Sequence, residues 1–319
     1  MLNVDNLRVY YNTNRGLLKA VDDVSLSIGK GEILGLVGES GCGKTTVGMS
    51  IMGLLPNSAH VYDGKILFDG HDILNAPKAE IRNIRWKLVS IIFQGALNSL
   101  NPVLTIREQI AEAILAHEKI SAHEVDSRID TLFGYVGLDP RRKKNYPHEF
   151  SGGMKQRIMI AMALACNPLL VIADEPTTAL DVVVQHQILE LIRSLRDKLQ
   201  ISMILITHDL SVVAELCDKV AIMYAGKIAE ISGIFQLFEE PKHPYTRALL
   251  RSIPKLKGAK TSLTFIPGSI PDLTGPMPAC RFYDRCPYHQ DLCAEREPKP
   301  EPVAPDHVVA CHFWRDVGK

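Results

Sequence analysis

A glycine-rich segment of the chain has the residue types and spacing needed to bind phosphate. Gly38-Glu-Ser-Gly-Cys-Gly-Lys44-Thr45 fits the pattern GxxxxGK[ST]. It follows the apolar run Ile33–Val37, a predicted strand, and precedes a predicted helix at residues 46–55. Glycines let successive backbone N–H groups turn toward phosphate oxygens, and the helix directs its positive end at the same charge. The residues expected to contact the nucleotide are Gly38, Ser40, Gly41, Cys42, Gly43, Lys44, Thr45 and Thr46.

Within this loop, two side chains carry the expected chemistry. Lys44 should reach the β- and γ-phosphates of ATP, and the Thr45 hydroxyl should coordinate Mg²⁺. The Cys42 side chain is expected to act only as a small filler. A chance glycine-rich turn is the simpler interpretation, and the order of strand, loop and helix argues against it.

Two acidic residues end another predicted strand. The apolar run at residues 169–173 is followed directly by Asp174 and Glu175. Because the carboxyl ends of strands in an open α/β sheet face the ligand crevice, we expect Asp174 to bind Mg²⁺. Glu175 is then placed to act as the general base for the attacking water. Taken alone this is an ordinary solvated acidic turn, but its combination with the glycine-rich loop favours catalysis.

A second anion site is predicted at the start of another helix. Ser151, Gly152 and Gly153 precede a predicted helix at residues 155–166, and N–H groups at a helix start attract phosphate. One nucleotide cannot easily use both sites within a compact domain. We therefore expect a head-to-tail pair of chains, with each ATP held between the glycine-rich loop of one chain and the SGG helix of the other.

Short apolar runs alternate with longer amphipathic stretches along most of the chain. This alternation predicts an α/β fold with a largely parallel central sheet and an antiparallel section. The predicted strands are residues 24–28, 33–37, 65–68, 89–93, 169–173, 203–207, 220–224 and 227–232, and the predicted helical regions are 46–55, 106–137, 155–166 and 185–199.

The bulk properties are those of a globular protein with a main domain and an appendage. The chain has 319 residues, 46% of them apolar and 23% charged, with a net charge of zero. This neutrality gives no support to a general binder of nucleic acid or membrane surfaces. The start of the chain lacks the pattern of a signal peptide, and the most apolar segment, at residues 158–173, is shorter than the roughly 20 residues of a membrane span. We therefore expect a cytosolic chain, in which structural disulfides are rare.

The last part of the chain is rich in proline and cysteine. Ten of the nineteen prolines lie between residues 254 and 305, so an irregular tail without continuous helices or central strands is expected. Cys280, Cys286, Cys293 and Cys311 follow the spacing C-x5-C-x6-C-x17-C. Four thiolates can hold a [4Fe–4S] cluster or a tetrahedral Zn²⁺, and either would organise a segment without its own core. A mixed-ligand zinc site and free thiols or disulfides are the other interpretations. The histidines that such a zinc site would use are His289, His307 and His312.

The ordered motifs resemble those of ATP-binding subunits of ATP-binding cassette (ABC) transporters. FSGGM at residues 150–154 resembles the family signature LSGGQ. The resemblance implies roles for further residues: Gln94 as the glutamine that reaches the metal site, Asp181 in the loop at the dimer seam, and His208 at the γ-phosphate. It also implies that Tyr11 stacks on adenine, with the neighbouring Tyr10 as the alternative. The resemblance covers residues 2–254 and implies a P-loop NTPase fold.

The implied domains are an ABC ATPase domain at residues 1–254, with a helical subdomain at about 95–165, and a C-terminal extension at 255–319. The stretch HPYTRALL at residues 243–250 and the sequence after it resemble the dipeptide/oligopeptide importer subgroup, and within it the D-type chains of dipeptide importers. Relatives in that subgroup share a C-terminal cysteine cluster, which favours [4Fe–4S] over Zn²⁺.

The subgroup implies an ATPase that powers peptide import from the cytoplasmic face of the cell membrane. The implied partners are a second, non-identical ATPase chain, two transmembrane permease subunits and, indirectly, an extracytoplasmic peptide-binding protein, with no nucleic acid. Two alternatives remain: the ATPase of a nickel or other small-solute importer, and a soluble ABC ATPase working on ribosomes or DNA. The soluble class usually carries two cassettes or a long coiled-coil insertion, and this sequence shows neither.

Overall fold

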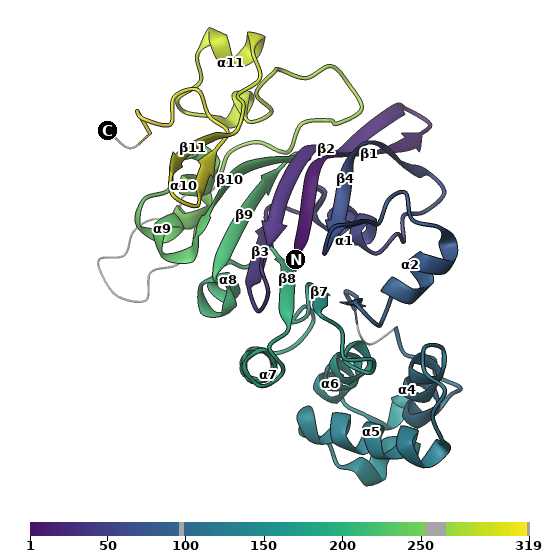
Figure 1. Cartoon of the computed structure of the whole chain (residues 1–319). Coiled ribbons are helices and arrows are strands. Elements are labelled where there is room, and N and C mark those ends of the chain that lie inside the picture. Colours follow the sequence, from purple (N-terminus) through teal and green to yellow (C-terminus); the bar gives the residue numbers. More distant parts are fainter. Residues whose placement is uncertain (96–98, 253–265, 318–319) are drawn as a thin grey trace. The chain divides into compact units, whose positions relative to one another are not determined.

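The computed structural model describes residues 1–95, 99–252 and 266–317 and forms two compact units (Figure 1). The first unit comprises Met1–Ile28, Ile33–Leu74 and Ile206–Lys319, and the second comprises Gly29–Glu32 and Asn75–Leu205. The predicted domain boundary between residues 254 and 255 lies outside the described residues. It therefore stays a prediction.

An antiparallel sheet of four strands begins the first unit, as the predicted antiparallel section requires. Its order is β2-β1-β4-β5, and the two residue pairs Leu2/Val4 and Leu7/Val9 on either side of an irregularity in β1 are fully buried. This period of two places one face of the strand in the core. The strands are β1 (Leu2–Thr13), β2 (Gly16–Ile28), β4 (Ala59–Phe68) and β5 (His71–Asp72).

The remaining strands of the first unit follow the order β11-β12-β10-β9-β3. β3 pairs with β9 in parallel, whereas β10 pairs with β9 in antiparallel fashion through the predicted turn at Ala225 and Gly226. The strands are β3 (Ile33–Val37), β9 (Lys219–Tyr224), β10 (Lys227–Gly233), β11 (Glu301–Ala304) and β12 (His307–Val309). The helices are α1 (Lys44–Ile51), α8 (Leu210–Leu216), α9 (Ile234–Glu239), α10 (Pro244–Arg251), α11 (Asp291–Glu295) and the 3-10 turn η3 (Tyr283–Arg285).

The C-terminal extension is more ordered than the sequence predicted. Instead of an entirely irregular tail, it contributes two strands, of which β12 pairs with β10 and β11 pairs with β12. Pro302 lies on β11, the edge strand, where a missing N–H group costs little, and β12 contains no proline. The extension also buries Phe282, Leu273 and Val309 in the first unit. It therefore has a share in a hydrophobic core.

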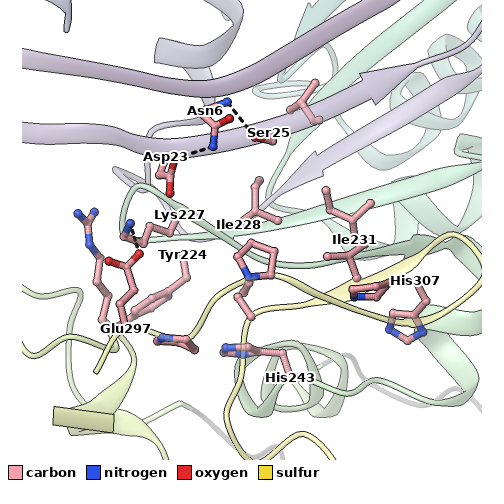
Figure 2. A pocket seen from close by; sticks show the side chains of 18 of the residues that line it. Asn6, Asp23, Ser25, Tyr224, Lys227, Ile228, Ile231, His243, Glu297 and His307 are labelled. Atoms are coloured by element: carbon pink, nitrogen blue, oxygen red, sulfur yellow. Dashed lines mark hydrogen bonds and ion pairs between the residues drawn. The ribbon is translucent and has the colours of Figure 1, made fainter. Parts of the chain in front are cut away.

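A cavity of about 540 Å³ lies between this extension and the strands β1, β2 and β10 (Figure 2). Its apolar lining includes Ile228 and Ile231, and its polar lining residues form pairs with one another. Asn6 donates to Asp23, and Lys227 forms an ion pair with Glu297 of the extension. The first pair joins β1 to β2, and the second connects the extension to β10.

The second unit contains parallel strands and a group of helices. β6 (Val89–Ile92) pairs in parallel with β7 (Leu170–Asp174), and the strand order here is β8-β7-β6. β8 (Ser202–Thr207) belongs to this unit up to Leu205. Every residue of β7 and β8 is buried, which explains why both strands are apolar except at their ends. The helices are α2 (Lys78–Ile84), α4 (Ile106–Leu115), α5 (Ala122–Tyr135), α6 (Gly152–Ala163) and α7 (Val182–Leu199), with the 3-10 turns η1 (Pro140–Lys144) and η2 (Pro147–Glu149).

The helical region predicted at residues 106–137 consists of two helices, each with its own start signal. Thr105 and Glu108 form a capping box at α4, and Ser121 and Glu124 form another at α5. Each box satisfies two backbone groups at a helix start, so the chain begins a new helix at Ser121. α4, α5 and α6 lie together in the second unit (Figure 1).

Among the residues that the structure describes, no helix is both long and apolar enough to span a membrane.

A buried Glu–His pair joins the extension to β10. Glu230 and His307 are both fully buried, and His307 Nε2 lies 2.7 Å from Glu230 Oε1. Glu230 also accepts hydrogen bonds from the backbone N–H groups of Lys242 and His243. Burial alone would raise the pKa of Glu230, but these hydrogen bonds outweigh it, so the pKa is lowered. The folded state thus holds Glu230 as a carboxylate.

We predict that Glu230→Gln lowers the free energy of unfolding by about 3–5 kcal/mol, because it removes one partner of a buried pair. A folded-state pKa below the unfolded value stabilises the fold above the unfolded pKa, and that contribution is lost as pH falls through the folded pKa. The wild type should therefore lose more stability than the variant as the pH falls below the usual pKa of a glutamate, about 4.3. Urea unfolding at several pH values measures this difference in stability.

Glu190→Gln, in an exposed pair with Arg193, is the control and should not shift the urea midpoint of unfolding. An equal pH profile for wild type and Glu230→Gln would contradict the prediction.

Candidate functional site

The glycine-rich loop between β3 and α1 is shaped by close backbone contacts. A Cβ atom on Gly38 would collide with the carbonyl oxygen of Met223, and one on Gly43 would collide with that of Ala20. Gly43 also has a φ of 104°, which side chains disfavour. The backbone of the neighbouring strands therefore leaves no room for a side chain at these two loop positions, whether or not phosphate is bound.

Lys44 lies inside the loop. Its side chain is 6% exposed, and its Nζ donates hydrogen bonds to the carbonyl oxygens of Gly38, at 2.7 Å, and Glu39, at 3.0 Å. The ammonium group is thus fixed at the centre of the loop, at the start of α1, where a helix N-terminus attracts anions. The loop combines a fixed positive charge with a helix start, which suits a phosphate group.

The neighbouring residues Tyr10 and Tyr11 have different partners. The Tyr11 hydroxyl lies 3.1 Å from Thr46 Oγ1, beside the loop. The Tyr10 hydroxyl donates to Asp22 at 2.7 Å. Burial, with the Asp22 carboxylate, raises the pKa of Tyr10 to about 12. Of the two, Tyr11 is the one that contacts the loop helix.

His208 also belongs to the first unit. It follows the last residue of β8, and its side chain is exposed. The next residue, Asp209, caps α8 by accepting from the N–H of Ser211 at 2.8 Å. His208 therefore lies between the end of the buried strand β8 and the capping residue of α8.

The second unit holds the acidic pair and Gln94. Asp174 is the last residue of β7 and is 3% exposed. Glu175 follows with a φ of 46°, so the chain turns sharply at this point. Glu175 Oε2 accepts hydrogen bonds from Gln94 Nε2 at 2.9 Å and from Thr178 Oγ1 at 2.8 Å. Two residues that the sequence could link only by resemblance are therefore in contact.

Two helix starts come together in the same unit. Ser151 caps α6, and Asp181 caps α7 by accepting from the N–H of Val184 at 2.9 Å. A Cβ on Gly153 would lie 2.6 Å from Val184 Cγ1, so the two starts are in close contact. The predicted anion site at Ser151, Gly152 and Gly153 thus lies beside the predicted dimer-seam loop.

Three residues at the loop were missed as functional residues by the sequence analysis: Glu39, Tyr245 and Arg285. The Tyr245 hydroxyl accepts from the N–H of Glu39 at 3.1 Å, and Arg285 Nη1 donates to Glu39 Oε2 at 3.0 Å. The HPY stretch at residues 243–245 is the sequence pattern that could have pointed to Tyr245. His243 Nδ1 caps α10 by accepting from the N–H of Tyr245, and Pro244 occupies the first turn. Burial lowers the pKa of His243 to about 4, which keeps the ring neutral as an acceptor.

The four cysteines of the extension line one small cavity, together with His289 and His312. All seven cysteines of the chain are described, and each is a free thiol. Within the described residues, no group of three or more His, Cys, Asp and Glu side chains is arranged to hold a single metal ion. Burial, with the neighbouring thiols adding to it, raises the pKa of Cys280 to about 11 and that of Cys311 to about 12. The four thiols thus converge without forming a mononuclear metal site.

Comparison with known proteins identifies the family. The family model described as ABC transporter matches residues 21–178, and the one described as oligopeptide/dipeptide transporter, C-terminal region, matches residues 229–293. The chain is 48% identical over 314 residues to the dipeptide transport ATP-binding protein DppD of Bacillus subtilis, covering 98% of this chain and 94% of the relative. It is 43% identical over 313 residues to the oligopeptide transport ATP-binding protein OppD of Escherichia coli, covering 98% and 92%. The chain belongs to the ATP-binding subunits of peptide ABC transporters.

Solved structures confirm the P-loop fold of this ABC protein. The ATP-binding cassette MJ0796, in a dimeric post-hydrolysis state bound to ADP and phosphate, matches with a TM-score of 0.66 and 26% identity, covering 73% of this chain and 99% of that chain. CbiO1 of Clostridium perfringens, part of an ABC transporter complex, matches with a TM-score of 0.65 and 28% identity, covering 75% and 90%. The C-terminal family region contains His243, Tyr245 and Arg285. The matched region thus includes the HPY stretch and three of the four cysteines of the extension, Cys280, Cys286 and Cys293.

We predict that Gly43→Ala lowers the affinity of this ABC protein for ATP by at least about tenfold, because the new Cβ must displace backbone rather than a flexible side chain. Titration with a fluorescent ATP analogue measures the affinity. Gly41→Ala is the matched comparison: Gly41 has a similar positive φ, of 79°, but a Cβ there would meet nothing within 4 Å. It should cause a clearly smaller loss, and equal losses would contradict the role of the close contact with Ala20.

Proposed function

We propose that this chain hydrolyses ATP to power the import of dipeptides or oligopeptides through membrane permease subunits. The observation that carries the proposal is the full-length similarity to peptide-transport ATP-binding proteins, at 42–48% identity over nearly the whole chain. The preserved phosphate loop and the contact between Gln94 and Glu175 support an active ATPase.

ATP binding is assigned to the loop of the first unit. Lys44 is held where it can exchange its bonds to two carbonyl oxygens for bonds to phosphate oxygens. Lys44 is also the first residue of α1, and the N–H groups at a helix start attract phosphate. Tyr11, beside Thr46, is proposed to stack on the adenine ring, and the engagement of Tyr10 with Asp22 supports this choice.

Hydrolysis is assigned to Glu175. Its carboxylate accepts from Gln94 and Thr178, which orient it without adding a positive charge. An oriented carboxylate can take a proton from the attacking water as a general base. Thr45, Gln94 and Asp174 are proposed to hold Mg²⁺, and their oxygen donors fit a hard cation. When bound, Mg²⁺ would neutralise charge on the β- and γ-phosphates, and His208 is proposed to contact the γ-phosphate.

A second ATPase chain is proposed to complete the site. The start of α6 carries N–H groups that suit a phosphate, and Asp181 starts the adjacent helix α7. The next residues, Val182 and Val183, are 80% and 68% exposed. Two adjacent exposed valines next to an anion-binding helix start favour contact with a partner chain. The solved relative MJ0796 is dimeric in its post-hydrolysis state, which supports a dimer here.

The peptide substrate class follows from the named relatives, since the ATPase itself does not contact the solute. The alternatives are import of nickel or another small solute, and a soluble ABC ATPase. Affinity purification of the tagged chain from membranes tests these. Recovery of two polytopic permease subunits is expected, and recovery of nucleic acid in their place would support the soluble class. Binding assays on the associated extracytoplasmic binding protein then separate peptide from nickel.

A [4Fe–4S] cluster is proposed for the four thiols of the extension. The thiols line one cavity, yet no three ligands are arranged around a single-ion position in the described chain. In a tetrahedral zinc site the sulfur atoms lie about 3.8 Å apart, whereas in a cluster each cysteine binds a different iron atom and the thiols are spread wider. Cys280, Cys286, Cys293 and Cys311 would hold the cluster, which would supply cross-links between segments of the extension.

We predict that Glu175→Gln leaves ATP affinity within about threefold of wild type but lowers the rate of phosphate release by about 10²–10⁴-fold, because the amide cannot accept the proton. Nucleotide titration and phosphate release, measured on the chain assembled with its partner, give the two quantities. Glu190→Gln, on the exposed face of α7, should change neither. Wild-type turnover in Glu175→Gln would contradict the assignment of the general base.

We predict that anaerobically purified protein is brown and contains about four iron and four acid-labile sulfide per chain. Cys293→Ser should lose both, because Cys293 is one of the four thiols at the cavity. Cys217→Ser is the matched control. Cys217 is also buried, but it lies at the end of α8 and does not line the cavity that contains the four cysteines. Colourless wild-type protein that contains neither iron nor sulfide would overturn the cluster, and one zinc per chain would establish the alternative.

A further inference from the structure

The phosphate loop contains a carboxylate where negative charge is unfavourable. Glu39 directly follows Gly38 and is the only acidic residue among residues 38–45. The triphosphate of ATP carries several negative charges, and a nearby unpaired carboxylate would repel it. Something in the fold must therefore compensate for Glu39 if the loop is to bind ATP tightly.

Arg285 of the C-terminal extension provides that compensation. Arg285 Nη1 lies 3.0 Å from Glu39 Oε2 and 3.2 Å from the Tyr224 hydroxyl, and Nε donates to the carbonyl of Pro267 at 2.8 Å. The Arg285 side chain is 6% exposed, and that of Glu39 is 28% exposed. A guanidinium fixed by several partners at low exposure is a persistent positive charge.

The other polar groups of Glu39 are also held. Its N–H donates to the Tyr245 hydroxyl, and its carbonyl accepts from Lys44. Lys44 is the residue that the proposed function assigns to the phosphates, so the position of Glu39 sets the position of the Lys44 ammonium. The extension thereby contacts the loop at Glu39. The carboxylate of this residue would repel phosphate, and its carbonyl oxygen holds Lys44.

We propose that Arg285 is a positioning residue that neutralises Glu39 and holds it against the extension, so that the phosphate loop accepts the triphosphate of ATP. The inference rests on the proposed placement of ATP at this loop. It goes further by making the C-terminal extension a determinant of ATP affinity.

The decisive variant is Arg285→Gln in the full-length chain, with ATP affinity as the readout. We expect the dissociation constant for ATP to rise about tenfold, which corresponds to about 1.4 kcal/mol. Glu39→Gln/Arg285→Gln should restore an affinity near wild type, because the repelling carboxylate is gone. A role of Arg285 in packing alone predicts no such restoration, since the double variant still lacks the guanidinium.

Three further measurements separate the effect of charge from that of structure. Arg285→Lys keeps the positive charge and should bind ATP within about threefold of wild type. Raising salt from about 0.05 to about 0.5 M should narrow the difference between wild type and Arg285→Gln, because salt screens the repulsion. Glu39→Gln alone should bind ATP at least as tightly as wild type, and it supplies the test if Arg285→Gln does not fold.

Arg281→Gln is the matched control for loss of a buried guanidinium. Arg281 lies in the same loop and is also 6% exposed, but its partner is Asp22 on β2 rather than a residue of the phosphate loop. The Arg281→Gln variant should have a lower melting temperature, but it should not show the salt-dependent loss of ATP affinity expected for Arg285→Gln. Lys44→Ala separates this inference from the proposed function, since retained ATP binding in that variant would refute the placement of ATP at the loop.

Three results would overturn the inference. The first is wild-type ATP affinity in Arg285→Gln while Lys44→Ala has lost binding. The second is a loss of affinity in Arg285→Gln that the added Glu39→Gln change does not relieve. The third is weaker ATP binding in Glu39→Gln alone.

Discussion

The crowding of backbone around Gly38 and Gly43 is the constraint on which the nucleotide site depends. The two glycines lie against the carbonyl oxygens of Met223 and Ala20, which belong to β9 and β2. The loop is further tied by the hydrogen bond from the N–H of Gly226 to the carbonyl of Cys42. The loop therefore acquires its shape only when strands from distant parts of the chain have packed around it. Lys44 can then occupy its centre, with its ammonium on loop carbonyls.

The C-terminal extension is part of this arrangement. Its strand β12 pairs with β10, and the buried His307–Glu230 pair ties the two elements together. Glu230 also binds the N–H groups at the start of α10, which places Tyr245 at the phosphate loop. A single buried carboxylate thus connects the sheet, the extension and the helix of the HPY stretch. Because it is fully buried and charged, its partners are needed for stability.

In the second unit, polar residues gather where buried elements end or begin. Asp174 and Glu175 end β7, and Ser151 and Asp181 begin α6 and α7. Strands and helices hide their backbone polar groups along their length and expose them at their ends, so reactive and anion-binding groups concentrate there. The contact of Gly153 with Val184 leaves no space for a larger residue at the start of α6.

The sequence by itself determined the P-loop fold and most of the elements, since the buried strands β3, β7 and β8 have mainly apolar sequences and the motifs lie at their ends. It also indicated the acidic pair and both helix starts, because these chemistries depend on local spacing. It did not reveal the strands of the extension, since β11 contains Pro302 and β12 has only three residues. Only the tertiary structure decided between Tyr10 and Tyr11 as the neighbour of Thr46 and brought Arg285 and Tyr245 to Glu39. These contacts join residues more than 30 positions apart, and local patterns carry no information about which distant side chains meet when the core packs.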